Sequence, residues 1–416
     1  MSGTRSATSV GAAARNRTRR LAVLASLLPA LLLAVSCHEA PRQYARLTVG
    51  TFWGGPAAEA LQRELIGIAD DMGAVHIDLR TFTLASLEDY VFRSQPLVGA
   101  RRLDLMIVPN DWLGRLWQRR LVLEVPPQRV ERLQQRLVRQ ALLAVSDSDH
   151  VLAYPICGEA LALVYDPERF PAPPATMDQV LSTPMPPGVQ PFAIDLSSPY
   201  YLAPLVSSYQ GFLLDLSGSF TWRHEVVERV VEKLRPAWGS PLGWRICRGR
   251  DLESLQLQLF EDGRLASFLA GPWLLSALEA GEHPFAVVPI PPFADSPHSA
   301  RALVGYQCAA VAHGSPWADV ALDIAERLCS SPVNERLNLA TRRLPVLLSS
   351  YRTEQALTSR GTIGFLRALE DGQFSPAESR WSQGSERVAT QLRGLTLLTS
   401  PPDAAALARM MGSDAP

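Results

Sequence analysis

The sequence lacks an excess of charge of either sign. Its 416 residues include 40 basic and 41 acidic side chains, so the formal net charge is −1. A nucleic-acid-binding surface needs a concentration of positive charge, and we therefore expect no nucleic-acid partner. The composition, 47% hydrophobic and 19% charged, is also not that of a disordered chain. The length is instead sufficient for two or three domains, each with its own core.

After residue 36 the sequence contains no apolar run long enough to span a membrane. The one long run, residues 21–35, follows a segment with five arginines and no acidic residue. It ends in small residues directly before Cys37. A spanning helix needs about 18 or more apolar residues, so this pattern is typical of a cleavable export signal. It resembles a bacterial lipoprotein signal, in which Cys37 is acylated; cleavage at a nearby site, with Cys37 incidental, is the alternative.

We therefore predict a signal peptide at residues 1–36 and a tether at 37–45. Removal of the signal lowers the formal net charge from −1 to −6, because the five arginines are lost. The mature chain is expected to be acidic, to lie outside the cytoplasmic membrane in the periplasm or at the cell surface, and to be held there by a lipid anchor. The pair Arg19-Arg20 matches a twin-arginine export signal only loosely.

The sequence is also poor in residues that bind metals or form nucleophilic sites. Four cysteines follow Cys37 (Cys157, Cys247, Cys308 and Cys329), without Cys-x-x-Cys or Cys/His spacing, and the seven histidines are scattered. We find no Gly-x-Ser-x-Gly, P-loop or His-Glu-x-x-His motif. The sequence therefore indicates no metal and no cofactor. An oxidising compartment would permit disulfides, and four cysteines allow three complete pairings.

The first hundred residues of the mature chain alternate between strand and helix patterns. Apolar strands are predicted at residues 47–49, 75–79 and 105–108. The intervening helices include one with Ala58, Leu61, Leu65 and Ile68 on one face. Such alternation predicts a parallel sheet covered by helices, with functional residues on the loops that follow the strands. A second α/β stretch is predicted at 191–303, and a mostly helical segment after residue 317.

Two loops at the ends of predicted strands carry tryptophan. Trp53 follows the first strand, and Trp112 follows Asp111 after the third. One tryptophan is most often a core residue. Two tryptophans at equivalent positions after strands instead favour aromatic side chains that line the edge of a ligand-binding site.

One carboxylate, Glu159, lies inside the apolar run of residues 154–166. A buried carboxylate needs hydrogen-bond donors or a cation. The sequence leaves two sources open, an arginine in a structural ion pair or the hydroxyl groups of a sugar, and we favour the sugar.

At this point the chain resembles the family 1 extracellular solute-binding proteins, the maltose-binding-like receptors of ABC importers. The similar segments extend over nearly the whole mature chain and occur in the family's order. They are residues 47–55, 104–111 and 154–166, Pro199-Tyr200-Tyr201, residues 263–268, Gly271-Pro272-Trp273, Val304-Gly305 and Trp381.

The resemblance implies the α/β two-lobe periplasmic-binding-protein fold of type II, with a mixed sheet flanked by helices in each lobe and a hinge between them. The N-terminal lobe would comprise residues 46–157 and 308–352, and the C-terminal lobe 161–303 and 358–416. The chain would cross between the lobes near 157–160, 304–308 and 350–358. Cys157 and Cys308 fall on the two implied hinge strands, and a disulfide between them is a further hypothesis; two buried free thiols are the alternative.

The resemblance also implies a function and a site. The protein would be a monomeric receptor that closes on a sugar and delivers it to the permease subunits of an ABC importer. Asp111 and Glu159 match acids that accept hydrogen bonds from sugar hydroxyls. Tyr200, Trp273, Trp381 and, less closely, Tyr201 match aromatics that stack on sugar rings, a role that suits the C–H patches on those rings.

The chain departs from the maltodextrin-binding subgroup at three places. Trp53-Gly54-Gly55 replaces an acid and a lysine, Trp112 replaces an arginine, and Ser198 replaces an acid before the tyrosine pair. A less charged and more aromatic site results, so we expect a disaccharide or short oligosaccharide other than maltose. Two rival functions remain: a glycosidase with Asp111 and Glu159 as its carboxylate pair, and a ligand sensor that keeps the fold without transport.

Overall fold

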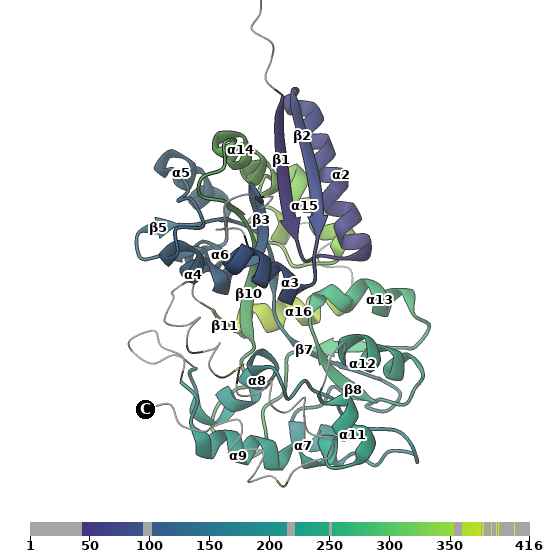
Figure 1. The fold of residues 1–416 in the computed structure, drawn as a ribbon. Coiled ribbons are helices and arrows are strands. Elements are labelled where there is room, and N and C mark those ends of the chain that lie inside the picture. Colours follow the sequence, from purple (N-terminus) through teal and green to yellow (C-terminus); the bar gives the residue numbers. More distant parts are fainter. Residues whose placement is uncertain are drawn as a thin grey trace, which may run out of the picture.

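The described part of the chain has two main β-sheets (Figure 1) and a two-stranded sheet of β4 (Ser146–Asp147) and β5 (His150–Val151). The computed structural model describes residues 44–94, 102–213, 221–248, 252–352 and 360–375, and the single residues 377, 384, 388, 390 and 403. The larger sheet has the order β11-β10-β3-β1-β2, and β6 also pairs with β10. Its strands are β1 (Ala45–Thr51), β2 (Val75–Thr81), β3 (Leu105–Pro109), β6 (Tyr154–Glu159), β10 (Leu303–Val311) and β11 (Gln373–Phe374).

The N-terminal half of the larger sheet is parallel, as its sequence pattern predicts. Strand β1 pairs in parallel with both β2 and β3, and the connection from β1 to β2 is α2 (Gly55–Met72). This helix buries Leu61, Leu65 and Ile68, which recur at the spacing of one helical face. Helices α14 (Ala318–Leu328) and α15 (Ser331–Thr341) pack on α2. The predicted strands and the helix after the first of them are thus confirmed.

The smaller sheet consists of three antiparallel strands in the order β8-β7-β9. They are β7 (Ala162–Tyr165), β8 (Ser267–Ala270) and β9 (Ala286–Val288). Around it lie α7 (Met177–Ser182), α8 (Pro199–Gln210), α9 (His224–Lys233), α10 (Arg235–Trp238), α11 (Pro241–Ile246), α12 (Leu252–Glu261) and α13 (Leu275–Ala280). In Figure 1 these elements form the lower half of the molecule, and β1, β2, β3, α2, α14 and α15 form the upper half.

Short elements complete the larger-sheet half and the turns. They are α3 (Leu84–Asp89), the π-helical turn η1 (Tyr90–Ser94), the 3-10 turn η2 (Asn110–Trp112), α4 (Leu113–Gln118), α5 (Pro127–Arg136), α6 (Arg139–Ala144), β4 (Ser146–Asp147), β5 (His150–Val151), and the 3-10 turns η3 (Pro272–Leu274) and η4 (Ser350–Arg352). No helix in the described part of the chain is both long and apolar enough to cross a membrane.

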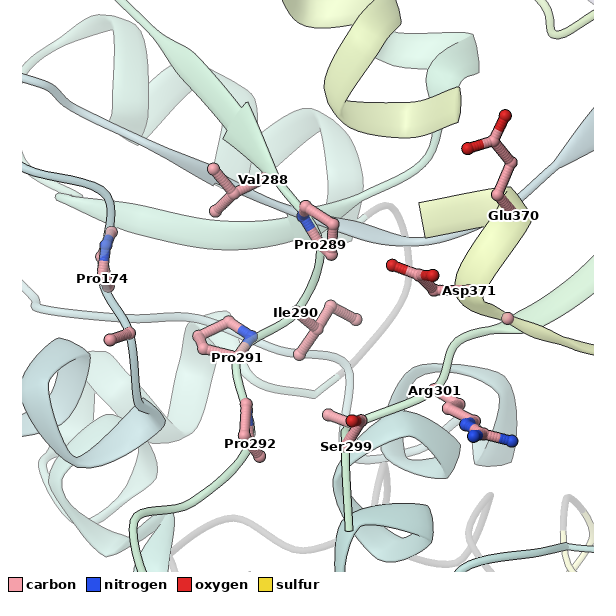
Figure 2. Close-up of a pocket in the computed structure, with 13 residues that line it drawn as sticks. Pro174, Val288, Pro289, Ile290, Pro291, Pro292, Ser299, Arg301, Glu370 and Asp371 are labelled. Atoms are coloured by element: carbon pink, nitrogen blue, oxygen red, sulfur yellow. The ribbon is translucent and has the colours of Figure 1, made fainter. Parts of the chain in front are cut away.

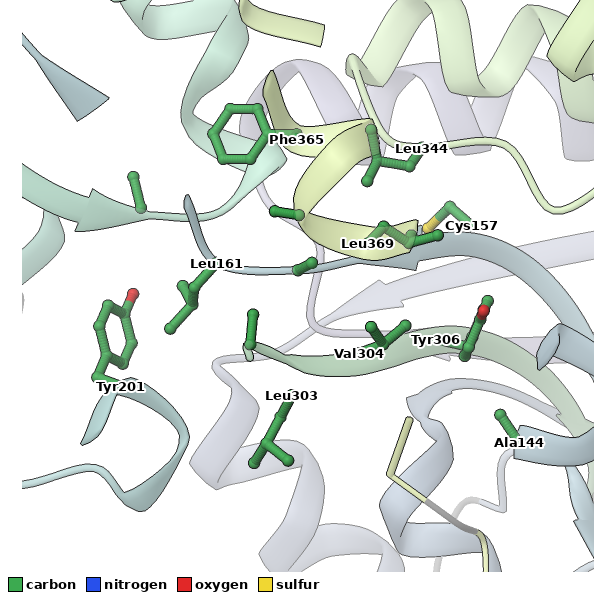
Figure 3. Packing of buried hydrophobic residues seen from close by; sticks show 14 of the residues in the cluster. Ala144, Cys157, Leu161, Tyr201, Leu303, Val304, Tyr306, Leu344, Phe365 and Leu369 are labelled. Carbon is green, nitrogen blue, oxygen red and sulfur yellow. The ribbon is translucent and has the colours of Figure 1, made fainter. Parts of the chain in front are cut away.

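The chain passes between the two sheets at several places. Strand β6 belongs to the larger sheet and β7 to the smaller one, so two residues, Ala160 and Leu161, connect them. Helix α16 (Arg360–Asp371) packs against β9 of the smaller sheet and leads into β11 at the edge of the larger one. Figure 3 shows this region, where Leu344 and Leu369 lie on the side of Cys157 and Phe365 lies on the side of Leu161. The buried apolar residues continue from one sheet to the other through these crossings.

The four described cysteines are free and buried. Cys157 lies opposite Gln307 in the β6–β10 ladder, whereas Cys308 lies opposite Pro155 after a register shift. The predicted disulfide between Cys157 and Cys308 is therefore wrong in this structure: the ladder does not place the two residues as a pair, and the Cys308 thiol donates to the Tyr306 carbonyl oxygen instead. Burial raises the pKa of the Cys157 thiol to about 11, which keeps it protonated at neutral pH.

Asn110 joins three segments at the end of β3. Its side-chain amide donates to the carbonyl oxygens of Ala144 (3.1 Å) and Ser375 (2.6 Å), and its carbonyl oxygen accepts from the Tyr306 backbone N–H (2.8 Å). The side chain is 1% exposed, so water cannot replace these bonds. It thereby ties both β10 and the segment after β11 to β3.

Substitution Asn110→Ala is expected to lower the free energy of unfolding by about 3 kcal/mol, because buried backbone groups lose their partners. Chemical denaturation measures this loss. Asn338→Ala serves as the comparison: Asn338 is also buried, but its shortest hydrogen bond goes to the Asn334 side chain (2.8 Å), so a smaller loss is expected. Equal losses in the two variants would show that Asn110 has no special role at this junction.

Candidate functional site

Asp111 lies in a turn directly after a strand of the larger sheet. It follows β3 within η2, and its side chain is half-buried. Burial raises its pKa to about 6, Arg115 opposes this shift, and Glu88 adds to it. Arg115 also forms an ion pair with Glu88 (2.7 Å). Asp111 is therefore a carboxyl group whose protonation changes close to neutral pH.

This shift makes stability depend on pH, with the sign set by the raised pKa. Between about pH 4 and pH 6, Asp111 ionises in the unfolded chain and stays protonated in the folded one. Its contribution therefore reduces stability as pH rises through this window. We expect Asp111→Asn to become more stable than the wild type as pH rises from 4 to 7, in thermal melts at matched ionic strength. A difference that stays constant over this range would contradict the raised pKa.

Three residues of the smaller-sheet half form a hydrogen-bonded group, and Tyr200 packs beside it. Tyr201 on α8 donates its phenolic O–H to Glu253 on α12. The indole N–H of Trp273, in η3, donates to both carboxylate oxygens of Glu253, at 3.1 Å each. The ring of Tyr200 lies 6.0 Å from that of Tyr201, edge to face. Glu253 thus holds two aromatic side chains in place, and Tyr200 and Trp273 remain only half-buried.

Local sequence explains the position of Trp273. Strand β8 ends at Ala270, and Gly271-Pro272 turns the chain into η3. A Cβ atom at residue 271 would collide with the indole ring of Trp273. Only glycine therefore lets the ring fold back over its own turn, which accounts for the Gly-Pro-Trp sequence. The ring is held from the other side by Glu253.

Tyr200 is the member of the aromatic group on which the charge of Asp111 acts. Burial raises the pKa of Tyr200, and the negative charges of Asp111 and Glu253 add to the shift, so both carboxylates lie near its phenol. Asp195, which precedes α8, is near Glu253 as well: burial raises the pKa of Asp195, and Glu253 raises it further. Its carboxylate accepts from the Ser197 backbone N–H (2.8 Å) and hydroxyl. Tyr200 is thus influenced by one carboxylate from each half of the molecule, Asp111 and Glu253.

The structure places Trp53 and Trp112 in the core. They are 1% and 6% exposed. Trp112 packs edge to face against Phe92 at 5.9 Å, and the Trp53 ring is covered by the Arg343 guanidinium at 4.4 Å. Neither offers an exposed aromatic face, which corrects the prediction of a tryptophan rim. Both rings belong to the buried apolar core, and removing their surface from water favours this position.

Glu159 is held by protein groups. Its carboxylate forms an ion pair with Arg343 and accepts from the Gln307 side-chain amide (2.8 Å). The structure therefore has the arginine ion pair, one of the two alternatives that the sequence left open. Trp381 and Cys37 lie outside the described residues.

Sequence reasoning missed four residues of this region: Asp195, Glu253, Gln307 and Arg343. Asp195 comes three residues before Ser198, at which the family pattern led us to look for an acid, so a wider window would have found it. Glu253 lies in the first turn of α12, 52 residues after Tyr201, and no local sequence pattern indicates that the two side chains are in contact. Gln307 and Arg343 reach Glu159 from 148 and 184 residues away along the chain.

A separate pocket lies between the segment that follows β9 and the C-terminal end of α16 (Figure 2). It has a volume of about 620 Å³ and is lined by Pro289, Pro291 and Pro292 after β9, by Arg301, and by Glu370 and Asp371 at the end of α16. None of the predicted site residues that the structure describes lines it. Within the described ranges, no three His, Cys, Asp or Glu side chains come together in a way that could hold a metal ion.

Comparison with known proteins identifies the family. Residues 98–360 match the model of the bacterial extracellular solute-binding protein family. The chain belongs to this family. Its members are substrate-binding receptors rather than enzymes, and they act outside the cytoplasm.

Individual relatives of this solute-binding protein are distant. It is 21% identical over 285 residues to the maltotriose-binding protein of Pyrococcus abyssi, a match that covers 66% of this chain and 61% of that protein. The GacH receptor of Streptomyces glaucescens superimposes with a TM-score of 0.75 at 16% identity, over 88% of this chain and 96% of the receptor.

The maltotriose-binding protein of Thermus thermophilus, bound with maltotriose, gives a TM-score of 0.72 at 20% identity, over 88% and 97% of the two chains. These similarities show that the fold is the two-lobe, type II periplasmic-binding-protein fold, as predicted.

Proposed function

We propose that this solute-binding protein is a carbohydrate receptor that captures a di- or oligosaccharide between its two sheets and delivers it to the permease of an ABC importer. The observation that carries the proposal is that the charge of Asp111, from the larger-sheet half, acts on Tyr200, which packs beside the Tyr201–Glu253–Trp273 group of the smaller-sheet half. Half-buried aromatic rings suit the apolar faces of a sugar, and carboxylates accept bonds from its hydroxyls. The distant relatives bind maltotriose or acarbose, which supports a carbohydrate.

Capture would proceed by movement of two lobes about the crossing segments. We propose residues 46–157 with 308–352 as one lobe and residues 161–303 with 358–416 as the other. The connection between β6 and β7 is only two residues long. A hinge needs only a few residues whose backbone torsions change, so this connection supports a hinge at this point. Closure would bring Asp111 and Tyr200 onto the same sugar.

Outside this site, we propose that Cys37 carries a lipid anchor after removal of residues 1–36, and that the receptor acts as a monomer. The export signal pattern and the family's extracellular location support the anchor. A glycosidase with Asp111 and Glu159 as its carboxylate pair is disfavoured, because the Glu159 carboxylate is already bound by Arg343 and by the Gln307 side-chain amide.

A thermal-shift screen of the chain from Ser36 onward, with Cys37→Ser, tests the proposal. Mono-, di- and trisaccharides are compared, including maltose and maltotriose. A sugar that binds only the folded state stabilises it by about 2.7 kcal/mol at a hundredfold excess over its dissociation constant. We expect a selective upward shift with a di- or trisaccharide. No shift with any sugar would favour a different solute, and release of the aglycone from an aryl glycoside would favour the enzyme.

A further inference from the structure

We infer that Glu253 is a positioning residue of the sugar site: it fixes the orientation of the Trp273 indole and sets the affinity for the sugar through that ring, without contacting the sugar itself. The inference rests on the proposed carbohydrate function. It assigns to a carboxylate on α12 an effect on binding that the aromatic residues alone do not explain.

The carboxylate of Glu253 is occupied by donors from the protein. Its Oε1 atom accepts the Tyr201 hydroxyl and the Trp273 indole N–H (3.1 Å), and Oε2 accepts the same N–H at 3.1 Å. Glu253 lies in the first turn of α12, where the helix dipole favours a negative charge. Hydrogen bonds to a charged acceptor are stronger than those between neutral groups. We therefore assign this carboxylate to the two aromatic side chains and not to the ligand.

The indole of Trp273 is fixed at both of its ends. The N–H, on the five-membered ring, is bonded to Glu253. The six-membered ring lies over Gly271, where a Cβ atom would be 2.0 Å from Cζ3 and 2.2 Å from Cη2. Gly271 thus provides the space for the ring, and Glu253 provides the bonds that hold the ring in that space. A planar group held in this way keeps one orientation.

The second half-buried ring of the group is also connected to Glu253. Tyr201, on α8, is 7% exposed and donates its hydroxyl to the carboxylate. Tyr200 packs edge to face against Tyr201, with 6.0 Å between the ring centroids. Glu253 therefore joins α8, α12 and η3 at the point where the two half-buried rings, Tyr200 and Trp273, lie.

This connection affects binding because stacking on a sugar needs an aromatic face in one orientation. A ring that is free before binding loses its rotamer freedom when the sugar arrives, and that loss of entropy opposes binding. When Glu253 already holds the indole, the same loss occurs on folding. The carboxylate then strengthens binding through Trp273, although it makes no bond to the sugar.

A double-mutant cycle of Glu253→Ala and Trp273→Ala tests this path, with titration calorimetry against maltotriose. Glu253→Ala alone should bind about 3- to 10-fold more weakly, the effect of ordering one side chain on binding. Glu253→Gln should recover most of this loss, because its carbonyl oxygen can still accept the indole N–H. In the Trp273→Ala background, Glu253→Ala should change affinity by less than about 2-fold, because the ring through which it acts is absent.

Asp295→Ala is the matched control. Asp295 accepts the hydroxyl of Tyr209 at 2.6 Å, and Tyr209 lies on the same helix as Tyr201. This variant should melt at a lower temperature and bind maltotriose like the wild type. Three results would overturn the inference: wild-type affinity in Glu253→Ala, an undiminished effect of Glu253→Ala in the Trp273→Ala background, or an equal loss of affinity in Asp295→Ala.

A measurement without ligand separates the inference from the proposed function. The near-ultraviolet circular dichroism of Trp273 is obtained by subtracting the spectrum of the matching Trp273→Phe variant, since a ring in fixed packing contributes to this signal. We expect the Trp273 contribution to be lost in Glu253→Ala and kept in Glu253→Gln. If the wild type does not bind maltotriose, the proposed ligand class fails. In that case an unchanged Trp273 contribution in Glu253→Ala overturns the positioning role, and its loss supports that role.

Discussion

Substitution Trp273→Ala is expected to weaken sugar binding by about 30- to 150-fold, which corresponds to roughly 2–3 kcal/mol. The indole is half-buried at the site, held by Gly271 from below and by two hydrogen bonds to Glu253. Its face is therefore already oriented before a sugar arrives, and little ordering entropy opposes stacking. Titration calorimetry with the sugar found by the thermal-shift screen measures the change.

Trp117→Ala is the control for this substitution. Trp117 is also partly buried, but it lies on α4 and packs against His150 at 5.1 Å, within the larger-sheet half. It should lower stability without changing affinity. An equal loss of affinity in both variants would indicate a general effect of destabilisation. A Trp273→Ala variant with wild-type affinity would show that the aromatic group around Glu253 is not the site.

The second large effect concerns stability. Arg343→Met is expected to lower the free energy of unfolding by about 3–5 kcal/mol, because it leaves the buried carboxylate of Glu159 without its cation. The cation covering Trp53 is lost at the same time. The double variant Glu159→Met/Arg343→Met should recover much of this loss, since it removes both charges and keeps similar volume. Chemical denaturation at neutral pH gives the three values.

An exposed ion pair provides the matched comparison. Arg336 binds Glu64 at 2.7 Å, but the arginine side chain is 59% exposed. Arg336→Met should cost less than about 1 kcal/mol, since water solvates the remaining carboxylate. If Arg343→Met costs no more than Arg336→Met, then Glu159 is solvated and the buried cluster described above does not exist in solution.

Local sequence patterns were sufficient to predict much of the fold. Leu61, Leu65 and Ile68 recur along α2 at the spacing of one helical face, and this face is the buried one, so the local sequence is enough to predict the helix. The prediction of a parallel sheet followed from the order of these elements, because parallel strands need a crossover connection between them. The pairing of β10 with β6 could not be derived from local patterns, because it joins residues about 150 positions apart.

Asp111, Tyr200 and Trp273 stay predicted site residues, whereas Trp53 and Trp112 are core residues. A tryptophan after a strand can turn toward the core or toward a ligand, and only the neighbours that surround it decide between the two. The same holds for Glu159: its partner Arg343 lies 184 residues away, so the sequence could show the need for a cation but not its source.

A crystal structure of the protein with its sugar tests the central claim most directly. The account predicts one sugar chain between the two sheets, with an aromatic face of Tyr200 or Trp273 against a ring and Asp111 accepting a hydroxyl bond. A sugar bound elsewhere, such as in the proline-lined pocket between β9 and α16, with Tyr200 and Trp273 untouched, would contradict it.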